Sequence, residues 1–191
     1  MIDELIKKCR SFRRFYQEGT ILRDDLLDMV NNARLSASAR NSQSLKYIIT
    51  NDKTTNGLIF PCLAWAGYLK DWTGPEEGER PSAYIVMLND TEITNNYFCD
   101  HGIAAQSILL TAVEKGLGGC IIASVNREKL RNELSIPPQY DIIQVIAPGK
   151  PKETVVLDPL GPDGDIKYWR DENKVHHVPK RSLEEIVLKQ K

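Results

Sequence analysis

The 191-residue sequence has few of the residues that support metal or disulfide chemistry. Its three histidines, His101, His176 and His177, are too few and too scattered to indicate a metal site. Its cysteines stand at positions 9, 62, 99 and 120, and no two have the two-residue gap of a zinc knuckle or a redox motif. We therefore expect free thiols and no metal ion.

The chain also lacks features that direct proteins to membranes or nucleic acids. No apolar run approaches the length that spans a bilayer. Asp3 and Glu4 place acid where a signal peptide carries base. The net charge of −1 gives no electrostatic reason for binding nucleic acid or an anionic membrane. We predict a cytoplasmic protein with neither kind of partner.

Several common catalytic motifs are missing. No Gly-x-Gly-x-x-Gly follows a strand pattern, and no phosphate-binding loop ending in Gly-Lys-Ser/Thr is present. There is no Gly-x-Ser-x-Gly nucleophile elbow. Acid pairs such as residues 24–25 and 76–77 are typical of solvated surface. These absences leave little support for a hydrolase or a transferase.

Helical and strand patterns alternate along the chain, which indicates an α/β or α+β fold with one sheet. Residues 1–10, 58–69, 101–115 and 127–134 have helical character, as does a segment that begins near Arg23. Residues 46–50, 82–88, 120–125 and 141–147 have strand character. The tail from residue 155 is polar and carries prolines. We treat residues 1–191 as a single domain.

The segment 101–115 is apolar over most of its circumference. A helix of this kind is buried on all sides. Its cover is either the sheet of its own chain or a partner subunit, and periodicity alone does not separate the two.

Three other segments concentrate chemistry-bearing residues. The first, residues 10–15, sets three arginines and Ser11 between Phe12 and Phe15. Guanidinium groups and a hydroxyl suit a phosphate, through charge-assisted hydrogen bonds. The alternative is a basic surface turn anchored by the two aromatic rings.

The second segment, residues 36–43, joins a predicted helix to a predicted strand. Its small residues allow the backbone to approach a ligand closely. Asn41 and Gln43 each offer donors and acceptors, which suits the edge of a heteroaromatic ring. The alternative is an ordinary loop at the end of a helix.

The third segment, residues 114–120, contains Gly116, Gly118 and Gly119. One glycine is enough to end a helix, whereas three suggest that backbone N–H groups face a ligand at close range. The alternative is a tight turn between a helix and a strand.

In order and spacing, these segments resemble the FMN-dependent nitroreductase family along nearly the whole chain. The family's Arg-Ser-x-Arg-x-Phe pattern resembles residues 10–15, and its Ser-x-x-Asn-x-Gln stretch resembles residues 38–43. Its Gly-Leu-Gly turn is similar to residues 116–119. The remaining matches are Ile136, Pro137, residues 149–151, and the basic pair Lys180 and Arg181.

The resemblance implies the α+β class, with a mixed sheet flanked by helices, and an intertwined homodimer with FMN at the subunit interface. It implies that the flavin phosphate is held by Arg10, Ser11, Arg13, Lys180 and Arg181. Ser38, Asn41 and Gln43 would contact the ribityl chain and the ring from the other subunit. Arg13, Asn41 and Gln43 would stabilise charge near the pyrimidine ring, and the backbone of Gly118 or Gly119 would donate to the reactive edge.

The sequence departs from the family pattern at a few positions. Cys9 stands where the family often has a further arginine, and we expect Arg14 to replace that contact in part. Ala37 and Ser44 stand where the family has prolines. Residues 56–81 form a variable helix and loop that we expect to cover the flavin.

The function implied is an oxidoreductase that uses FMN and NADH or NADPH to reduce electron-poor acceptors such as nitroaromatics or quinones. The flavin would carry the chemistry, with no obligatory catalytic side chain. Tyr68 and Trp72 are candidates for stacking a flat substrate, with structural packing as the alternative. Two further alternatives stay open: a dimeric flavin-binding protein without turnover, and another flavin reaction such as flavin reduction, dehalogenation or enoyl reduction.

Overall fold

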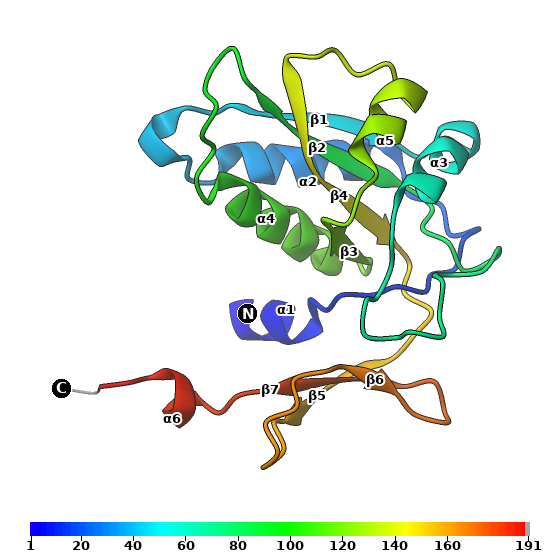
Figure 1. The fold of residues 1–191 in the computed structure, drawn as a ribbon, viewed down its shortest axis with the longest axis vertical. Coiled ribbons are helices and arrows are strands. Elements are labelled where there is room, and N and C mark those ends of the chain that lie inside the picture. Colours follow the sequence, from blue (N-terminus) through cyan, green and yellow to red (C-terminus); the bar gives the residue numbers. More distant parts are fainter. Residues whose placement is uncertain (190–191) are drawn as a thin grey trace.

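The computed structural model describes residues 1–189 as a larger sheet wrapped by helices and a smaller sheet near the C-terminus (Figure 1). The larger sheet has the order β1-β2-β4-β3, and every neighbouring pair is antiparallel. Its strands are β1 (Leu45–Thr50), β2 (Tyr84–Asp90), β3 (Gly118–Ile122) and β4 (Tyr140–Gly149). The α+β class predicted for the chain is confirmed, but the single mixed sheet that was expected is instead an antiparallel sheet with a separate smaller one.

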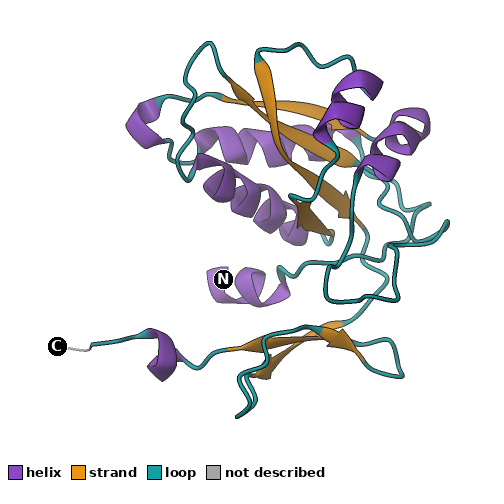
Figure 2. Cartoon of the chain, viewed as in Figure 1, coloured by secondary structure: helices purple, strands orange, loops and turns teal. Residues whose placement is uncertain are grey.

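Two layers of helices enclose this sheet (Figure 2). On one face lie α2 (Arg23–Leu35) and α4 (Asp100–Glu114), and on the other lie α3 (Lys53–Ile59) and α5 (Arg127–Glu133). Every residue of β2 is buried, which explains why its sequence is nearly continuously apolar.

The core is divided by the alternation of side chains along β2. Ile85 and Met87 belong to the cluster that includes α2 and α4, whereas Val86 and Leu88 belong to the cluster on the opposite face. The sheet is therefore a rigid platform with two separate cores.

One face of α4 stays open in the single chain. Ala105, Ile108 and Ala112 are fully buried, but Gly102, Ile103 and Gln106 are exposed. The helix α1 (Ile2–Lys8) contacts α4 and buries none of its own residues. The all-round burial predicted for this helix is therefore incomplete within one protomer.

The prediction of a helix over residues 58–69 was wrong. The helix α3 begins earlier because Asp52 caps it, accepting a hydrogen bond from the Thr55 amide at 2.7 Å. A 3-10 turn, η2 (Phe60–Cys62), carries Pro61, after which Leu63 is extended and Ala66 has a φ of 43°. The chain then runs irregularly to β2.

Strand β3 begins two residues before the predicted start at Cys120, so Gly118 and Gly119 belong to the sheet and not to a turn. Gly116, with a φ of 73°, follows the end of α4 in the left-handed region, as predicted for a helix cap.

The C-terminal tail forms structure that the sequence analysis did not predict. The smaller sheet has the order β5-β7-β6, with β5 (Val155–Pro159), β6 (Trp169–Arg170) and β7 (His176–Lys180). A short helix, α6 (Leu183–Ile186), follows. Figure 1 shows this sheet below α1, apart from the larger one. Within residues 1–189, no helix is long and apolar enough to cross a membrane.

Candidate functional site

The N-terminal motif lies along the beginning of β3. Ser11 forms a parallel bridge with Gly119, and the Phe12 amide donates to the Gly119 carbonyl at 3.0 Å. Phe15 then bridges Pro151, which follows the end of β4. The segment 10–15, the glycine pair and the Gly-x-Pro sequence are therefore brought together by backbone pairing.

The glycines at this corner permit close packing within the chain. A Cβ atom on Gly118 would collide with the Phe12 ring, and one on Gly119 would lie 2.7 Å from a methyl carbon of Leu109. Gly149 faces the Phe15 ring in the same way. Both Gly118 and Gly119 are buried. The Phe12 ring explains why Gly118 lacks a side chain, and Leu109 explains it for Gly119.

Arg13 is the most enclosed charged residue of the motif, with 9% of its surface exposed. Its Nη1 donates to the Ser11 carbonyl at 3.2 Å and to His176 Nε2 at 3.0 Å. Its guanidinium group lies 4.5 Å over the Tyr168 ring. With Tyr168 and Trp65 it lines a cavity of about 230 Å³ beside residues 120–124.

His176 is a neutral partner for Arg13. Burial, together with the charges of Arg13 and Arg170, lowers the pKa of His176 to about 4. Because Nε2 accepts the bond from Arg13, the proton of the neutral ring is on Nδ1, which is buried without a partner in residues 1–189. His176 is fully buried, with an exposed fraction of 0%.

Glu153 organises the backbone of the motif. Its buried carboxylate accepts hydrogen bonds from the Arg13 amide, from the Arg14 amide at 3.2 Å and from Arg170 Nη2 at 2.9 Å. The guanidinium group of Arg170 in turn lies 4.2 Å over the Trp72 ring. Glu153 therefore ties the N-terminal motif to the smaller sheet.

The side chain of Arg14 is committed to Glu79. Two of its nitrogens donate to the Glu79 carboxylate, at 2.5 and 2.6 Å, and Lys152 approaches the same carboxylate at 3.0 Å. The hydrogen bond from Arg14 is the main cause that lowers the pKa of Glu79 to about 2. The fork of Arg14 is thus occupied within the chain, away from Arg10 and Ser11.

Arg10 stands at the end of α1. Its Nη2 donates to the Ile6 carbonyl at 2.5 Å, and its Nε is buried without a partner within residues 1–189. Cys9 beside it accepts a weak hydrogen bond from Gln106 at 3.7 Å. Burial raises the pKa of the Cys9 thiol, which is therefore neutral.

The loop containing Ser38, Asn41 and Gln43 is anchored at the start of α4. The buried carboxylate of Asp100 accepts from Ser38 Oγ at 2.7 Å and from the Ala39 amide at 2.9 Å. Asn41 and Gln43 are exposed, and the Gln43 amide donates to Ser38 Oγ at 3.0 Å.

The backbone of this loop is strained. Arg40, Asn41 and Gln43 have φ values of 54°, 53° and 52°, in the left-handed region that residues other than glycine seldom occupy. Strain of this kind persists where the surroundings hold it, and it clusters at ligand-binding sites.

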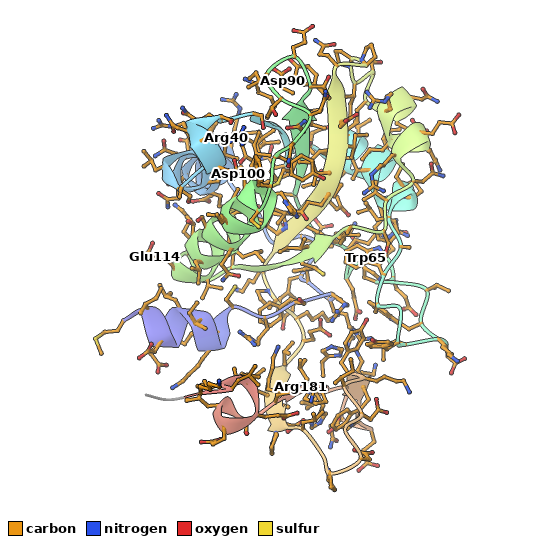
Figure 3. The ribbon with its side chains drawn as sticks, turned by 60° about the vertical axis from the view of Figure 1, so that its left-hand side comes forward. Arg40, Trp65, Asp90, Asp100, Glu114 and Arg181 are labelled. Carbon is orange, nitrogen blue, oxygen red and sulfur yellow. The ribbon has the colours of Figure 1, made fainter. Side chains whose placement is uncertain are left out.

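The two groups of motif residues lie at opposite ends of α4. Figure 3 shows Arg40 and Asp100 at one end of this helix and Glu114 at the other. Because α4 has 15 residues at about 1.5 Å each, the Ser38 loop and the Ser11–Gly119 corner are roughly 20 Å apart in one chain.

The remaining predicted residues are also separate. Lys180 ends β7, Arg181 forms an ion pair with Glu185, and neither bonds to Arg10 or Ser11 in residues 1–189. The Tyr68 ring lies 4.9 Å from that of Tyr168, so it packs against the chain itself, as Trp72 does against Arg170.

Comparison with known proteins decides the fold. Residues 75–150 match the model of the Nitroreductase family. A nitroreductase family protein from Clostridium novyi NT is similar at 25% identity, with 80% of this chain and 87% of that chain covered and a TM-score of 0.66. The chain has the nitroreductase fold. No curated protein matches the sequence.

Two further structures share this nitroreductase fold. An FMN-dependent nitroreductase from Clostridium difficile R20291 is 25% identical over 80% of this chain and 88% of that chain, with a TM-score of 0.64. A nitroreductase family protein from Streptococcus pneumoniae TIGR4 is 18% identical over 85% and 96%, with a TM-score of 0.67. The resemblance inferred from the motifs is confirmed.

Within this nitroreductase fold, four residues that shape the site were not predicted from the sequence: Glu153, Asp100, Tyr168 and His176. Asp100 begins a predicted helix, but nothing in the sequence indicates that Ser38 is its partner. The other three belong to segments after the last predicted strand. Because the smaller sheet was not predicted, no local pattern assigned them to the N-terminal motif.

Proposed function

We propose that this chain is an FMN-dependent oxidoreductase in which Arg10, Ser11 and Arg13 bind the flavin phosphate, with Lys180 and Arg181 closing over it. The observation that carries the proposal is the unbalanced charge of Arg10 and Arg13. Neither guanidinium group forms an ion pair within residues 1–189, whereas Arg14, Arg170 and Arg181 each pair with a carboxylate.

The chemistry of these side chains fits FMN. A cation that is largely buried without a counter-charge is costly, and a bound anion relieves that cost. The Arg10 Nε is buried without a partner in residues 1–189, which is a donor still to be satisfied. A phosphate offers charge and acceptor oxygens to both arginines and to the Ser11 hydroxyl.

Bound FMN would supply two-electron transfer from NADH or NADPH to an electron-poor acceptor such as a nitroaromatic or a quinone. Arg13 would add a fixed positive charge, since the neutral ring of His176 does not cancel it. Asn41 and Gln43 would donate to the pyrimidine edge of the ring. Gly118 and Gly119 would position Ser11 and present backbone at the reactive edge, while Tyr68 and Trp72 in the cover of residues 56–81 would limit access.

The proposal requires a homodimer. The Ser38 loop and the Ser11–Gly119 corner are too far apart to form one compact site in a single chain. If two copies pair through the open faces of α4 about a twofold axis perpendicular to this helix, the two helices run antiparallel, and the Ser38 loop of one chain lies near the Ser11–Gly119 corner of the other. The exposed Ile103 and Gln106 lie on that face.

The visible absorption spectrum of the purified protein, with NADH or NADPH added without oxygen, tests the proposal. We expect a flavin band that bleaches when the donor is added. A band that does not bleach would point to another donor or to the absence of turnover. No band after incubation with FMN would overturn the proposal.

Cys9 favours one alternative. A neutral thiol in place of an arginine removes a phosphate contact, so a dimeric flavin-binding protein without turnover is the second candidate. A screen of electron acceptors separates it from enzymes that use the same cofactor for flavin reduction, dehalogenation or enoyl reduction.

A further inference from the structure

A second cavity lies on the α3 side of the molecule, and none of its lining residues belongs to the N-terminal motif of residues 10–15. Its volume is about 560 Å³, within the range of small-molecule sites. Residues 17–21, the helix α3 and residues 80–84 form its walls. It shares no lining residue with the cavity beside Arg13. A ligand here would not be the proposed flavin.

Arg80 supplies an unpaired guanidinium group to this cavity. The group lies 4.3 Å over the Phe60 ring, which fixes its orientation. Its side chain forms no ion pair and donates no hydrogen bond within residues 1–189, and its Nε is buried. Arg14 and Arg170, by contrast, each bond to a buried or nearly buried carboxylate.

Other polar groups around Arg80 also lack partners. Ser82 Oγ and Asn56 Oδ1 are buried and unbonded among the residues that the structure describes. Asn56 is held in place because its Nδ2 donates to the Ser82 carbonyl at 2.9 Å. Native proteins seldom leave several buried polar atoms unsatisfied at one place unless water, an ion or a ligand satisfies them.

Tyr84 adds a hydrogen-bond donor. Its ring is 1% exposed and it lines the cavity, and its hydroxyl makes no hydrogen bond within residues 1–189. Burial raises the pKa of this phenol, so it stays protonated and can donate.

The charges favour a single carboxylate over a phosphate. Of the four charged residues that line the cavity, Glu18, Lys53 and Glu77 are exposed, and Lys53 pairs with Glu18 at 3.1 Å. Arg80 is the one charge set into the wall. A planar guanidinium group matches a carboxylate in a bidentate manner, whereas a phosphate dianion would need a second cation.

We propose that this cavity binds a small carboxylate that also carries an O–H or N–H donor. Arg80 and Tyr84 donate to its oxygens, and Asn56 Oδ1 accepts from its donor group. The proposal does not depend on flavin binding, and the two are tested separately.

Titration of the protein with sodium lactate, followed by the arginine Nε–H signals in proton–nitrogen NMR spectra, tests this site. We expect one signal, assigned by its loss in Arg80→Lys, to shift saturably, and acetate, which lacks the donor, to bind several-fold more weakly. Arg80→Lys should weaken lactate binding at least tenfold, read from the amide of Ser82. Arg23→Lys, at an exposed position in α2, should leave binding unchanged.

Tyr84→Phe removes a single oxygen, so it provides a test even if Arg80→Lys folds poorly; we expect several-fold weaker binding. A shift that does not saturate, or equal binding by wild type and Tyr84→Phe, would overturn the proposal. Tighter binding of inorganic phosphate than of lactate would reject the carboxylate as the ligand class. These outcomes are independent of whether the protein holds FMN.

Discussion

Arg13 and Arg14 are adjacent and chemically identical, yet their surroundings give them different roles. Arg14 forms an ion pair with Glu79, 65 residues away, whereas the guanidinium group of Arg13 bonds only to neutral partners. The motif predicted that arginines gather here. It did not predict which one is neutralised, because the carboxylates that decide this are distant in sequence and no local spacing reports them.

Arg13→Ala should weaken FMN binding by about tenfold to a hundredfold, because a charge-assisted hydrogen bond contributes roughly 1.5–3 kcal/mol. The dissociation constant can be measured by quenching of flavin fluorescence, with circular dichroism to verify the fold. Arg23→Ala, at an exposed position in α2, is the control and should bind FMN like the wild type. Equal affinity in Arg13→Ala would reject the assigned phosphate site.

At the scale of elements, substitution by glycine should affect stability differently in the strained loop of residues 38–43 and in a helix. Arg40→Gly should leave the free energy of unfolding unchanged or raise it by up to ~1 kcal/mol, because glycine occupies positive φ without strain. Arg34→Gly, in the last turn of α2, should lower it by about 1 kcal/mol.

Urea denaturation measures both variants of this pair. An equal loss in the two would mean that the left-handed conformation at Arg40 is not strained. The sequence did not predict the shape of this loop. Asparagine and glutamine indicate only that a segment can form hydrogen bonds, whereas the backbone conformation depends on Asp100, which bonds to the loop from the start of α4.

The smaller sheet makes stability depend on pH through His176. Its folded pKa, about 4, is below the ordinary value of 6.5, so the unfolded chain takes up the proton first. This contribution is fully present above pH 6.5 and is lost as pH falls toward 4, by about 2 kcal/mol at pH 5. Between pH 7 and pH 5, the free energy of unfolding of His176→Gln should therefore fall less than that of the wild type.

His177→Gln is the matched control on the same strand. The hydrogen bond to Asp158 raises the pKa of His177, so its contribution is present at low pH and is lost as pH rises. In His177→Gln, the free energy of unfolding should therefore fall more between pH 7 and pH 5 than in the wild type, opposite to His176→Gln. Identical profiles for the two variants would contradict the buried, neutral assignment of His176.

Elements with a strong apolar pattern were predicted well, and those defined by distant contacts were not. The strand β2 and the helix α4 follow directly from their long apolar runs. The strands β5, β6 and β7 are short, partly exposed and interrupted by Pro159 and Pro179, so they have no clear period of two. Their contacts with the N-terminal motif run through buried Glu153 and His176, which are distant from it in sequence.

At the scale of the whole molecule, the open face of α4 and the separation of the motif residues have one common explanation. In the proposed twofold dimer, each of the two equivalent sites would be built from the Arg13 corner of one chain and the Ser38 loop of the other. A chain substituted at the Arg13 corner therefore still provides an intact Ser38 loop, and a chain substituted in that loop still provides an intact Arg13 corner. The consequence is that two differently damaged chains can restore each other.

Mixing an Arg13→Ala chain with an Asn41→Ala, Gln43→Ala chain, after joint unfolding and refolding, should restore wild-type affinity for FMN to some sites, whereas each variant alone binds FMN weakly at every site. Random pairing makes half of the dimers mixed, and each mixed dimer holds one undamaged site, so about a quarter of wild-type sites should return. Flavin absorbance after gel filtration measures the recovery, and each variant refolded alone is the control. If both sets of residues act within one chain, every site stays damaged and mixing restores nothing, which would reject the shared site even if the protein is a dimer.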